Sequence, residues 1–243
     1  MPTEKPTVVL VHGAFAESAS WNGVIRRLHA RSVEAIAVAN PLRSVSGDAA
    51  YLRDVVASVG GPVVLAGHSY GGLVVTEAAA GNDAVVALVY VGAFCPEPGE
   101  SALQLSTRFP GSTLGETLVA YPLTSGGNEL RIAPDAFPSQ FAADVPVETA
   151  VLMAATQRPV TELALSEGAP SPDPAWRDRP SWFVYGDADA NIPAELQRFM
   201  SARAGARGVR EVPGASHAVA VSQPDEVAAT ILAAVDAVIS VAA

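Results

Sequence analysis

The stretch VVLAGHSYGG, from Val63 to Gly72, constrains the fold more than any other part of the chain. A short β-branched run ends at its first glycine, and a helix-like segment, LVVTEAAA, begins at Leu73. Between them lies the pattern GxSxG, whose serine needs neighbours almost free of side chains because it sits on a sharp strand-to-helix turn. The stretch therefore predicts a strand, a turn and a helix in order, with the hydroxyl of Ser69 exposed at a helix N-terminus.

Around this turn, strand-like and helix-like segments alternate along the chain. The predicted strands are Thr7–Val11, Val33–Val38, Val63–Ala66, Val85–Val91, Trp182–Tyr185 and Val209–Val212. The predicted helices lie near Trp21–Ala30, Asp48–Val59, Leu73–Ala80, Ala194–Ala204 and Pro224–Val241. Such alternation is typical of an α/β fold, in which right-handed crossovers build a mostly parallel sheet flanked by helices.

The alternation is interrupted once, by a proline-rich, irregular stretch of residues 96–179. It follows the strand Val85–Val91 and so leaves the sheet at its carboxyl edge, where ligands bind in such folds. We therefore expect one domain, built from residues 1–95 and 180–243, with the stretch inserted as a helical lid that sets substrate choice. Within it the sequence predicts helices near Pro146–Thr156 and Pro159–Leu165 and a small hairpin over Tyr121–Ile132.

Composition narrows the classes of partner. A formal net charge of −10 with scattered arginines argues against nucleic acid and anionic membranes as partners, and favours a neutral small molecule.

The single cysteine, Cys95, excludes an intramolecular disulfide, and the first apolar run is too short for a signal peptide. The apolar C-terminal segment is interrupted by Thr230, Asp236 and Ser240, which suits a helix packed on a sheet. We expect a cytoplasmic protein without metal or cofactor, and the sequence leaves monomer and homodimer as alternatives.

A serine hydroxyl is a weak nucleophile at neutral pH and needs a base that is itself held by a carboxylate. Of the four histidines, His217 lies in a loop between the last predicted strand and helix, at the same sheet edge as Ser69. His68 is adjacent to the serine, but the side chains of neighbouring residues on such a turn point in different directions. His29 lies at a charged helix end, and His12 begins a different motif. His217 is therefore the candidate base.

Two aspartates follow the strand Trp182–Tyr185 and compete for the role of the acid. The next helix is predicted to start at Pro193, so Asp189 lies within the loop and can turn toward a histidine, whereas Asp187 is placed to shape the turn. We select Asp189 as the acid; Glu97 and Glu100, after the preceding strand, are remoter candidates.

Acyl transfer also needs two N–H donors for the negatively charged oxygen of the tetrahedral intermediate. The strand Thr7–Val11 ends at a His-Gly turn that should lie beside the serine. We expect the donors to be the amides of Ala14 and Tyr70, the latter being the residue after the nucleophile. Apolar side chains near this edge predict a pocket for an apolar acyl or alcohol group: Phe15, Phe94, Phe141, Met153 and Trp176.

These motifs resemble the α/β-hydrolase superfamily over the whole chain except the inserted stretch. The matching elements are VLVHGAF with Trp21 downstream, GHSYGG, GDADANIP and GASHAV, in the superfamily's order of nucleophile, acid and base. More narrowly, the chain is similar to a compact esterase group that includes plant methyl esterases and hydroxynitrile lyases. That group's GxxDxxxP pattern places the acid on Asp189, and its lid follows the sixth strand of the family's sheet. The resemblance implies a serine hydrolase that cleaves carboxylic esters through an acyl-enzyme.

Departures from relatives narrow the activity. Hydroxynitrile lyases carry a lysine after the catalytic histidine and a threonine in the first oxyanion loop, where this chain has Ala218 and Gly13. Dehalogenases and epoxide hydrolases use an aspartate where this chain has Ser69. Cofactor-free haloperoxidases, C–C bond hydrolases and ligand-binding proteins that keep the fold remain alternatives to an esterase.

Overall fold

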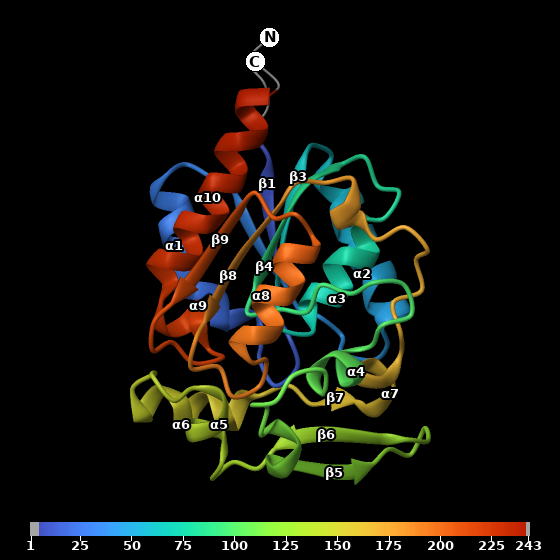
Figure 1. Cartoon of the computed structure of the whole chain (residues 1–243), viewed down its shortest axis with the longest axis vertical. Helices are drawn as coiled ribbons and strands as arrows, with labels where there is room; N and C mark the ends of the chain where they lie inside the picture. Colours follow the sequence, from blue (N-terminus) through green and yellow to red (C-terminus); the bar gives the residue numbers. More distant parts are fainter. Residues whose placement is uncertain (1–4, 242–243) are drawn as a thin grey trace.

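The computed structural model describes residues 5–241 and is built on one large parallel sheet. The strand order is β2-β1-β3-β4-β8-β9, and every neighbouring pair is parallel (Figure 1). The strands are β1 (Thr7–Val11), β2 (Ala35–Val38), β3 (Val63–His68), β4 (Val85–Val91), β8 (Ser181–Gly186) and β9 (Gly208–Val212). The predicted α/β class is confirmed.

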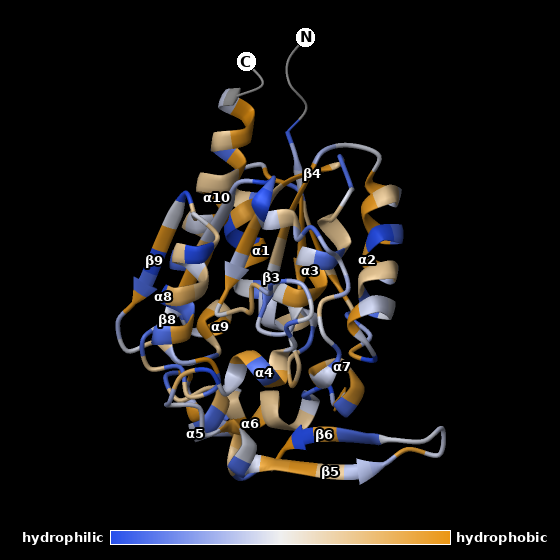
Figure 2. Ribbon diagram, turned by 45° about the vertical axis from the view of Figure 1, so that its right-hand side comes forward, coloured by the Kyte–Doolittle hydropathy of each residue, from blue (hydrophilic) through white to orange (hydrophobic). Residues whose placement is uncertain are grey.

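Helices cover both faces of this sheet. Because side chains alternate along a strand, Val8 and Leu10 of β1 pack on one face while Val9 and Val11 pack on the other. One face is covered by α1 (Asn22–Ala30), α9 (Val219–Ser222) and α10 (Pro224–Val241), and the other by α2 (Val45–Val59), α3 (Gly71–Ala79) and α8 (Ala194–Arg203). Figure 2 shows the apolar residues concentrated in the central strands and on the helix faces turned toward them. No helix in the described part of the chain is long and apolar enough to cross a membrane.

The insertion, residues 96–179, lies across the carboxyl edge of the large sheet (Figure 1). Its helices are α4 (Ala102–Ser106), α5 (Phe137–Phe141), α6 (Val147–Thr156) and α7 (Glu162–Ser166), with short 3-10 turns η2 (Leu114–Thr117) and η3 (Ala175–Arg177). It also contains an antiparallel sheet of β5 (Leu118–Pro122), β6 (Asn128–Ile132) and β7 (Val160–Thr161). The predicted hairpin is therefore present, and the description of a helical lid was incomplete.

One predicted helix of the insertion starts later than expected. The sequence predicts a helix from Pro159, but Val160 and Thr161 pair with β6 as the short strand β7. The helix α7 then begins at Glu162, because the side chain of Thr161 accepts a hydrogen bond from the amide of Ala164 (3.1 Å) and caps the first turn.

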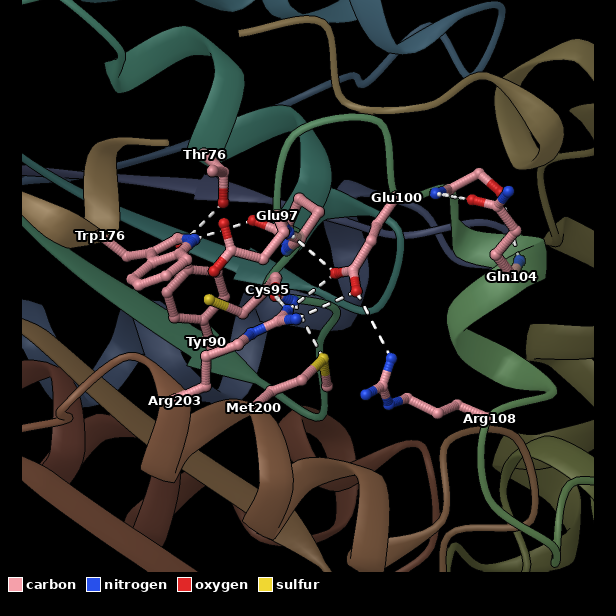
Figure 3. A network of polar contacts seen from close by, with 12 residues as sticks. Thr76, Tyr90, Cys95, Glu97, Glu100, Gln104, Arg108, Trp176, Met200 and Arg203 are labelled. Carbon is pink, nitrogen blue, oxygen red and sulfur yellow. Dashed lines mark hydrogen bonds and ion pairs between the residues drawn. The ribbon is translucent and has the colours of Figure 1, made fainter. Parts of the chain in front are cut away.

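Polar contacts join the two ends of the insertion to each other and fix its first residues to the core (Figure 3). The indole Nε1 of Trp176 donates to the carbonyl oxygen of Pro96 (2.8 Å). Arg203 of α8 donates to both carboxylate oxygens of Glu100 (3.0 and 2.9 Å) and to the carbonyl oxygen of Cys95. Burial raises the pKa of the Cys95 thiol to about 12, so this cysteine stays protonated and unreactive at neutral pH.

Candidate active site

Ser69 occupies the turn between β3 and α3 in a conformation that non-glycine residues rarely adopt. Its φ is +54°, in the left-handed region. The turn is possible because glycines flank it: a Cβ on Gly67 would lie 2.5 Å from the carbonyl oxygen of Gly71, and a Cβ on Gly71 would lie 2.6 Å from that of Val11. The close approach that the GxSxG pattern predicts is therefore required by the surrounding backbone, which holds the serine in a strained, fixed position.

The loop that follows β1 packs directly against this serine. A Cβ on Gly13 would lie 2.5 Å from the Cβ of Ser69, so only glycine allows the two segments to approach so closely. His12 fixes the loop, since its Nδ1 donates to the Gly13 carbonyl oxygen (2.9 Å) and its Nε2 accepts from the amide of Asn40 (3.1 Å). Burial lowers the pKa of His12 to about 4, so the imidazole is neutral at pH 7 and serves a structural role.

The two amides predicted as oxyanion donors flank Ser69 from different segments. Within residues 5–241, neither Ala14 nor Tyr70 donates its backbone N–H to a backbone carbonyl. By contrast, the adjacent residues Phe15 and Ser69 each donate their backbone N–H to a backbone carbonyl oxygen, with N···O distances of 3.0 and 3.3 Å. Ala14 and Tyr70 also line the same cavity as Ser69. Two backbone amides without a backbone partner therefore belong to residues that line the same cavity as Ser69, and their role as oxyanion donors stays a prediction.

His217 and Asp189 form a buried pair. The Nδ1 of His217 lies 2.7 Å from Oδ2 of Asp189, and each side chain is 1% exposed. The other carboxylate oxygen, Oδ1, accepts from the amides of Asn191 (2.7 Å) and Ile192 (2.9 Å). These bonds fix the carboxylate so that it accepts the Nδ1 proton, which leaves Nε2 of His217 free to accept a proton from another group.

The other acidic candidates lie elsewhere. Oδ1 of Asp187 accepts from the amide of Gly214 (2.6 Å), so this exposed aspartate braces the loop between β9 and His217. Glu97 pairs with Arg177, and Glu100 binds Arg203, both at the ends of the insertion. Asp189 is thus the candidate that the structure brings to His217.

Two residues hold His217 beside the turn of Ser69, in a role that the sequence did not predict for them. Nε2 of His68 donates to the carbonyl oxygen of His217 (3.0 Å), and the two rings are 4.7 Å apart. Burial keeps the pKa of His68 well below its ordinary value, so this ring is neutral. Phe141 packs edge-on against His217 at 4.9 Å and 88°. Because His68 directly precedes Ser69, its bond connects the loop of His217 to the turn of Ser69.

A largely apolar cavity of about 100 Å³ opens beside Ser69. The core contributes Phe15 and Phe94, as the sequence predicts, together with Asn191 and Ile192. The insertion contributes Leu103, Leu114, Leu118 and Leu165, which no sequence pattern indicated.

The other residues predicted to bind substrate lie away from this cavity. Met153 lines a second cavity of about 430 Å³ under α6, which shares Phe15 with the first. Phe141 lies behind His217, and Trp176 binds Pro96 at the base of the insertion. No cluster of metal-ligating side chains is found among residues 5–241.

The α/β-hydrolase architecture is defined by a parallel sheet that carries a serine on a strained strand-to-helix turn. An acid–base pair lies on the loops that follow later strands of the same sheet. Residues 8–230 match the family described as "Alpha/beta hydrolase family", and the chain belongs to that family.

Two curated proteins are similar in sequence. Esterase PIR7B of Oryza sativa subsp. japonica is 29% identical over an alignment that covers 92% of this chain and 93% of that protein. Alpha/beta hydrolase nvfD of Aspergillus novofumigatus (strain IBT 16806) is 35% identical over 126 residues, which are 44% of this chain and 50% of that protein.

Solved structures share the fold. Polyneuridine aldehyde esterase superimposes with a TM-score of 0.80 at 22% identity, covering 95% of this chain and 99% of that one. A pyrethroid hydrolase from Sphingobium faniae JZ-2 gives a TM-score of 0.75 at 22% identity, covering 96% and 98%. Tomato methylketone synthase I, complexed with 2-tridecanone, gives 0.80 at 20% identity, covering 96% and 99%.

Proposed function

We propose that this protein hydrolyses carboxylic esters through an acyl-enzyme formed on Ser69. The observation that carries the proposal is the placement of Ser69 on a strained turn in the wall of an apolar cavity, with the buried His217–Asp189 pair fixed to that turn through His68. Such a turn persists only where the surroundings enforce it, and this chain uses three glycines at close contacts to do so.

In the first half of the proposed reaction, Oγ of Ser69 attacks the ester carbonyl carbon while Nε2 of His217 takes the hydroxyl proton. Asp189 stabilises the resulting imidazolium through Nδ1. The amides of Ala14 and Tyr70 donate to the oxyanion of the tetrahedral intermediate. The intermediate collapses when the C–O bond to the alcohol breaks and His217 returns the proton to the departing alcohol oxygen.

In the second half, water replaces the alcohol. His217 takes a proton from the water as its oxygen attacks the acyl carbon of the Ser69 ester. The second intermediate then releases the carboxylic acid, and the proton returns to Oγ of Ser69. The cycle consumes one ester and one water and leaves the enzyme unchanged, so it needs no cofactor.

The proposed substrates are small, largely apolar esters. Four leucines of the insertion and two phenylalanines of the core line the cavity, and a net charge of −10 disfavours anionic substrates. Esterase PIR7B, which aligns over nearly the whole chain, supports ester hydrolysis as the reaction.

Turnover of a panel of esters graded by acyl and alcohol size tests the proposal. Wild-type protein should hydrolyse small neutral esters, and Ser69→Ala should lower kcat by roughly 10³-fold or more without changing the circular dichroism spectrum. A folded Ser69→Ala protein that retained wild-type turnover would exclude the acyl-enzyme.

A further inference from the structure

The side chain of Tyr70 connects the turn of Ser69 to a buried carboxyl group. Tyr70 directly follows Ser69, is 1% exposed and lines the same cavity. Its hydroxyl donates to Oδ2 of Asp48 (2.9 Å), which lies in the first turn of α2 and is also 1% exposed. Burial raises the pKa of Tyr70, so its hydroxyl keeps the proton that it donates. A buried hydrogen bond therefore joins the start of α3 to the start of α2.

Asp48 is itself held by the loop that precedes α2. The backbone amide of Arg43 lies 3.1 and 3.2 Å from the two carboxylate oxygens of Asp48, while the guanidinium of Arg43 binds Glu129 instead. The loop is also joined to β7, because Thr161 donates its amide to the carbonyl oxygen of Leu42 (3.1 Å) and its hydroxyl to that of Arg43 (2.6 Å). Asp48 can therefore act as a fixed anchor for the Tyr70 hydroxyl.

Stability alone does not explain a carboxyl group at this buried position. Burial raises the pKa of the Asp48 carboxyl, and the hydrogen bonds from Arg43 and Tyr70 oppose this rise. An apolar residue of similar volume is often at least as stabilising as a buried charged group. Asp48 does not line the cavity and takes no part in the proposed steps of ester cleavage. Any effect of Asp48 on the reaction must therefore pass through the residues that it binds.

The amide of Tyr70 is a group whose position such an anchor can control. This N–H has no backbone partner, so no backbone bond of its own holds it in place. It follows Ser69, whose φ of +54° persists only where the surroundings enforce it. An oxyanion donor has to lie within about 2.7–3.1 Å of the developing charge, and a small misplacement of a catalytic group costs rate.

We propose that Asp48 is a positioning residue of the oxyanion site, because its bond to the Tyr70 hydroxyl fixes the Tyr70 amide where the oxyanion forms. The proposal rests on the proposed function and deepens it, since it explains how one of the two predicted donors is held. Loss of the anchor displaces this donor but does not remove it. The expected cost is about tenfold, which is less than the roughly 10²- to 10³-fold cost of removing an oxyanion donor.

Binding of trifluoromethyl pentyl ketone and methyl pentyl ketone tests the proposal. Oγ of Ser69 adds to the carbonyl carbon of the fluorinated ketone while His217 takes the hydroxyl proton, and the carbonyl oxygen becomes an oxyanion. The methyl ketone resists this addition, so it reports binding without an oxyanion. The ratio of the two Kd values, measured by calorimetric titration, therefore reports the oxyanion site. Hydration of the fluorinated ketone cancels when variants are compared with wild type.

Two variants weaken the anchor by different amounts. Tyr70→Phe removes the hydroxyl and keeps the ring and the amide, so the preference for the fluorinated ketone should fall about tenfold, as should kcat/KM for esters. Asp48→Asn keeps an acceptor oxygen, but a neutral amide accepts a weaker hydrogen bond, so its loss should be smaller. Added to Tyr70→Phe, Asp48→Asn should change the preference by less than about twofold, because its effect passes through the hydroxyl.

Tyr90→Phe is the matched control. It also removes a buried hydroxyl that contacts α3, where Oη of Tyr90 lies 2.7 Å from Oγ1 of Thr76, but Tyr90 does not touch the turn of Ser69 or the cavity. Its ketone preference should equal that of wild type even if thermal melts show a loss of stability. The proposal is contradicted if folded Tyr70→Phe and Asp48→Asn proteins both keep the wild-type preference, since the anchor then serves stability alone.

The same measurements separate this proposal from the proposed function. Wild-type protein that prefers the fluorinated ketone but cleaves no ester would reject the esterase proposal, and a fall in Tyr70→Phe would still keep the role of the anchor. An active esterase whose preference is unchanged in both variants would reject the role of Asp48 alone. Equal Kd values for the two ketones in wild-type protein would reject both proposals.

Discussion

The large sheet and the insertion bury their side chains in different ways. Every residue of β3 is buried, because helices cover both faces of the sheet, whereas four of the five residues of β5 are exposed. Of the ten large apolar side chains that are exposed in the described chain, seven lie in the insertion. They are Leu103, Val119, Tyr121, Val147, Val151, Leu152 and Leu163. Burial on both faces fixes the position of a strand. Packing on one face leaves a strand freer to move and its exposed side chains freer to be substituted.

The residues of the candidate site also fall into two groups, one held rigidly by the core and one supplied by the insertion. Asp189 is held by two backbone amides and by His217, and Ser69 is held by glycine contacts that admit no side chain. The insertion contributes to the cavity mainly through leucines such as Leu118 and Leu165. Changes in the core should therefore affect the chemical step, and changes in the insertion should affect the choice of substrate.

The largest effect that separates the two regions is expected at the acid. Asp189→Asn should lower kcat by about 10²- to 10⁴-fold, because an amide no longer holds His217 in the tautomer that accepts a proton at Nε2. Asp187→Asn is the matched control in the same loop, and it should keep most activity and lose mainly stability through its bond to Gly214. Steady-state kinetics on both proteins checks this ranking, and the opposite ranking would move the acid to Asp187.

A smaller effect is expected for the cavity wall in the insertion. Leu118→Ala or Leu165→Ala should shift the preference between short and long or aromatic esters by about 1–3 kcal/mol in kcat/KM, since each empties part of an apolar pocket. Phe141→Ala is the contrasting variant of the same region. It lies behind His217, so it should lower turnover of all esters without changing their ranking. If the two leucine variants also slowed all esters equally, the insertion would contribute to chemistry and the division would fail.

A third effect, of similar size, concerns the pH dependence of the core's stability and does not involve the insertion. The folded pKa of His12 is about 4, below the unfolded value of 6.5, so the unfolded chain binds more protons between these values. The stability that neutral His12 contributes is complete above pH 6.5 and is lost as pH falls toward 4. Its share of the loss in unfolding free energy between pH 7 and pH 5 is about 2 kcal/mol.

Urea unfolding at the two pH values measures this loss in wild type and in His12→Asn. The variant should lose less stability than wild type by about that amount, because its amide does not titrate. An unchanged pH dependence in His12→Asn would show that burial of His12 does not control the stability of this loop.

The core was largely predictable from sequence because its signals are local. The limits of β1, β4 and α10 agree with the predicted ranges, since each is an uninterrupted apolar or amphipathic run with clear ends. The glycines on both sides of Ser69 likewise predict the sharp turn. Strand β2 is shorter than predicted because Val33 and Glu34 precede its pairing with β1. The arrangement of the insertion was less predictable, because its small sheet depends on pairing between segments about thirty residues apart.

Parts of the candidate site gave no signal that a single sequence could reveal. Phe141 reaches His217 across 76 positions of the chain, and Gln140 reaches Asn191 across 51. The spacing of the residues in these two contacts does not follow the sequence period of a helix or a strand, so no local pattern predicts them. Met153 and Trp176 were selected as apolar residues of the insertion, but such residues fill its own packing as readily as they line a cavity. Only the folded arrangement separates these two cases.

Labelling with a fluorophosphonate tests the central claim most directly, because the probe reacts with an activated serine and needs no knowledge of the natural ester. Intact mass and peptide mapping should show one adduct per chain, on Ser69. Its rate of formation should fall by about 10²-fold or more in folded His217→Ala protein, since the serine then has no base. An adduct that forms on another residue, or that forms on Ser69 equally fast without His217, would contradict the account.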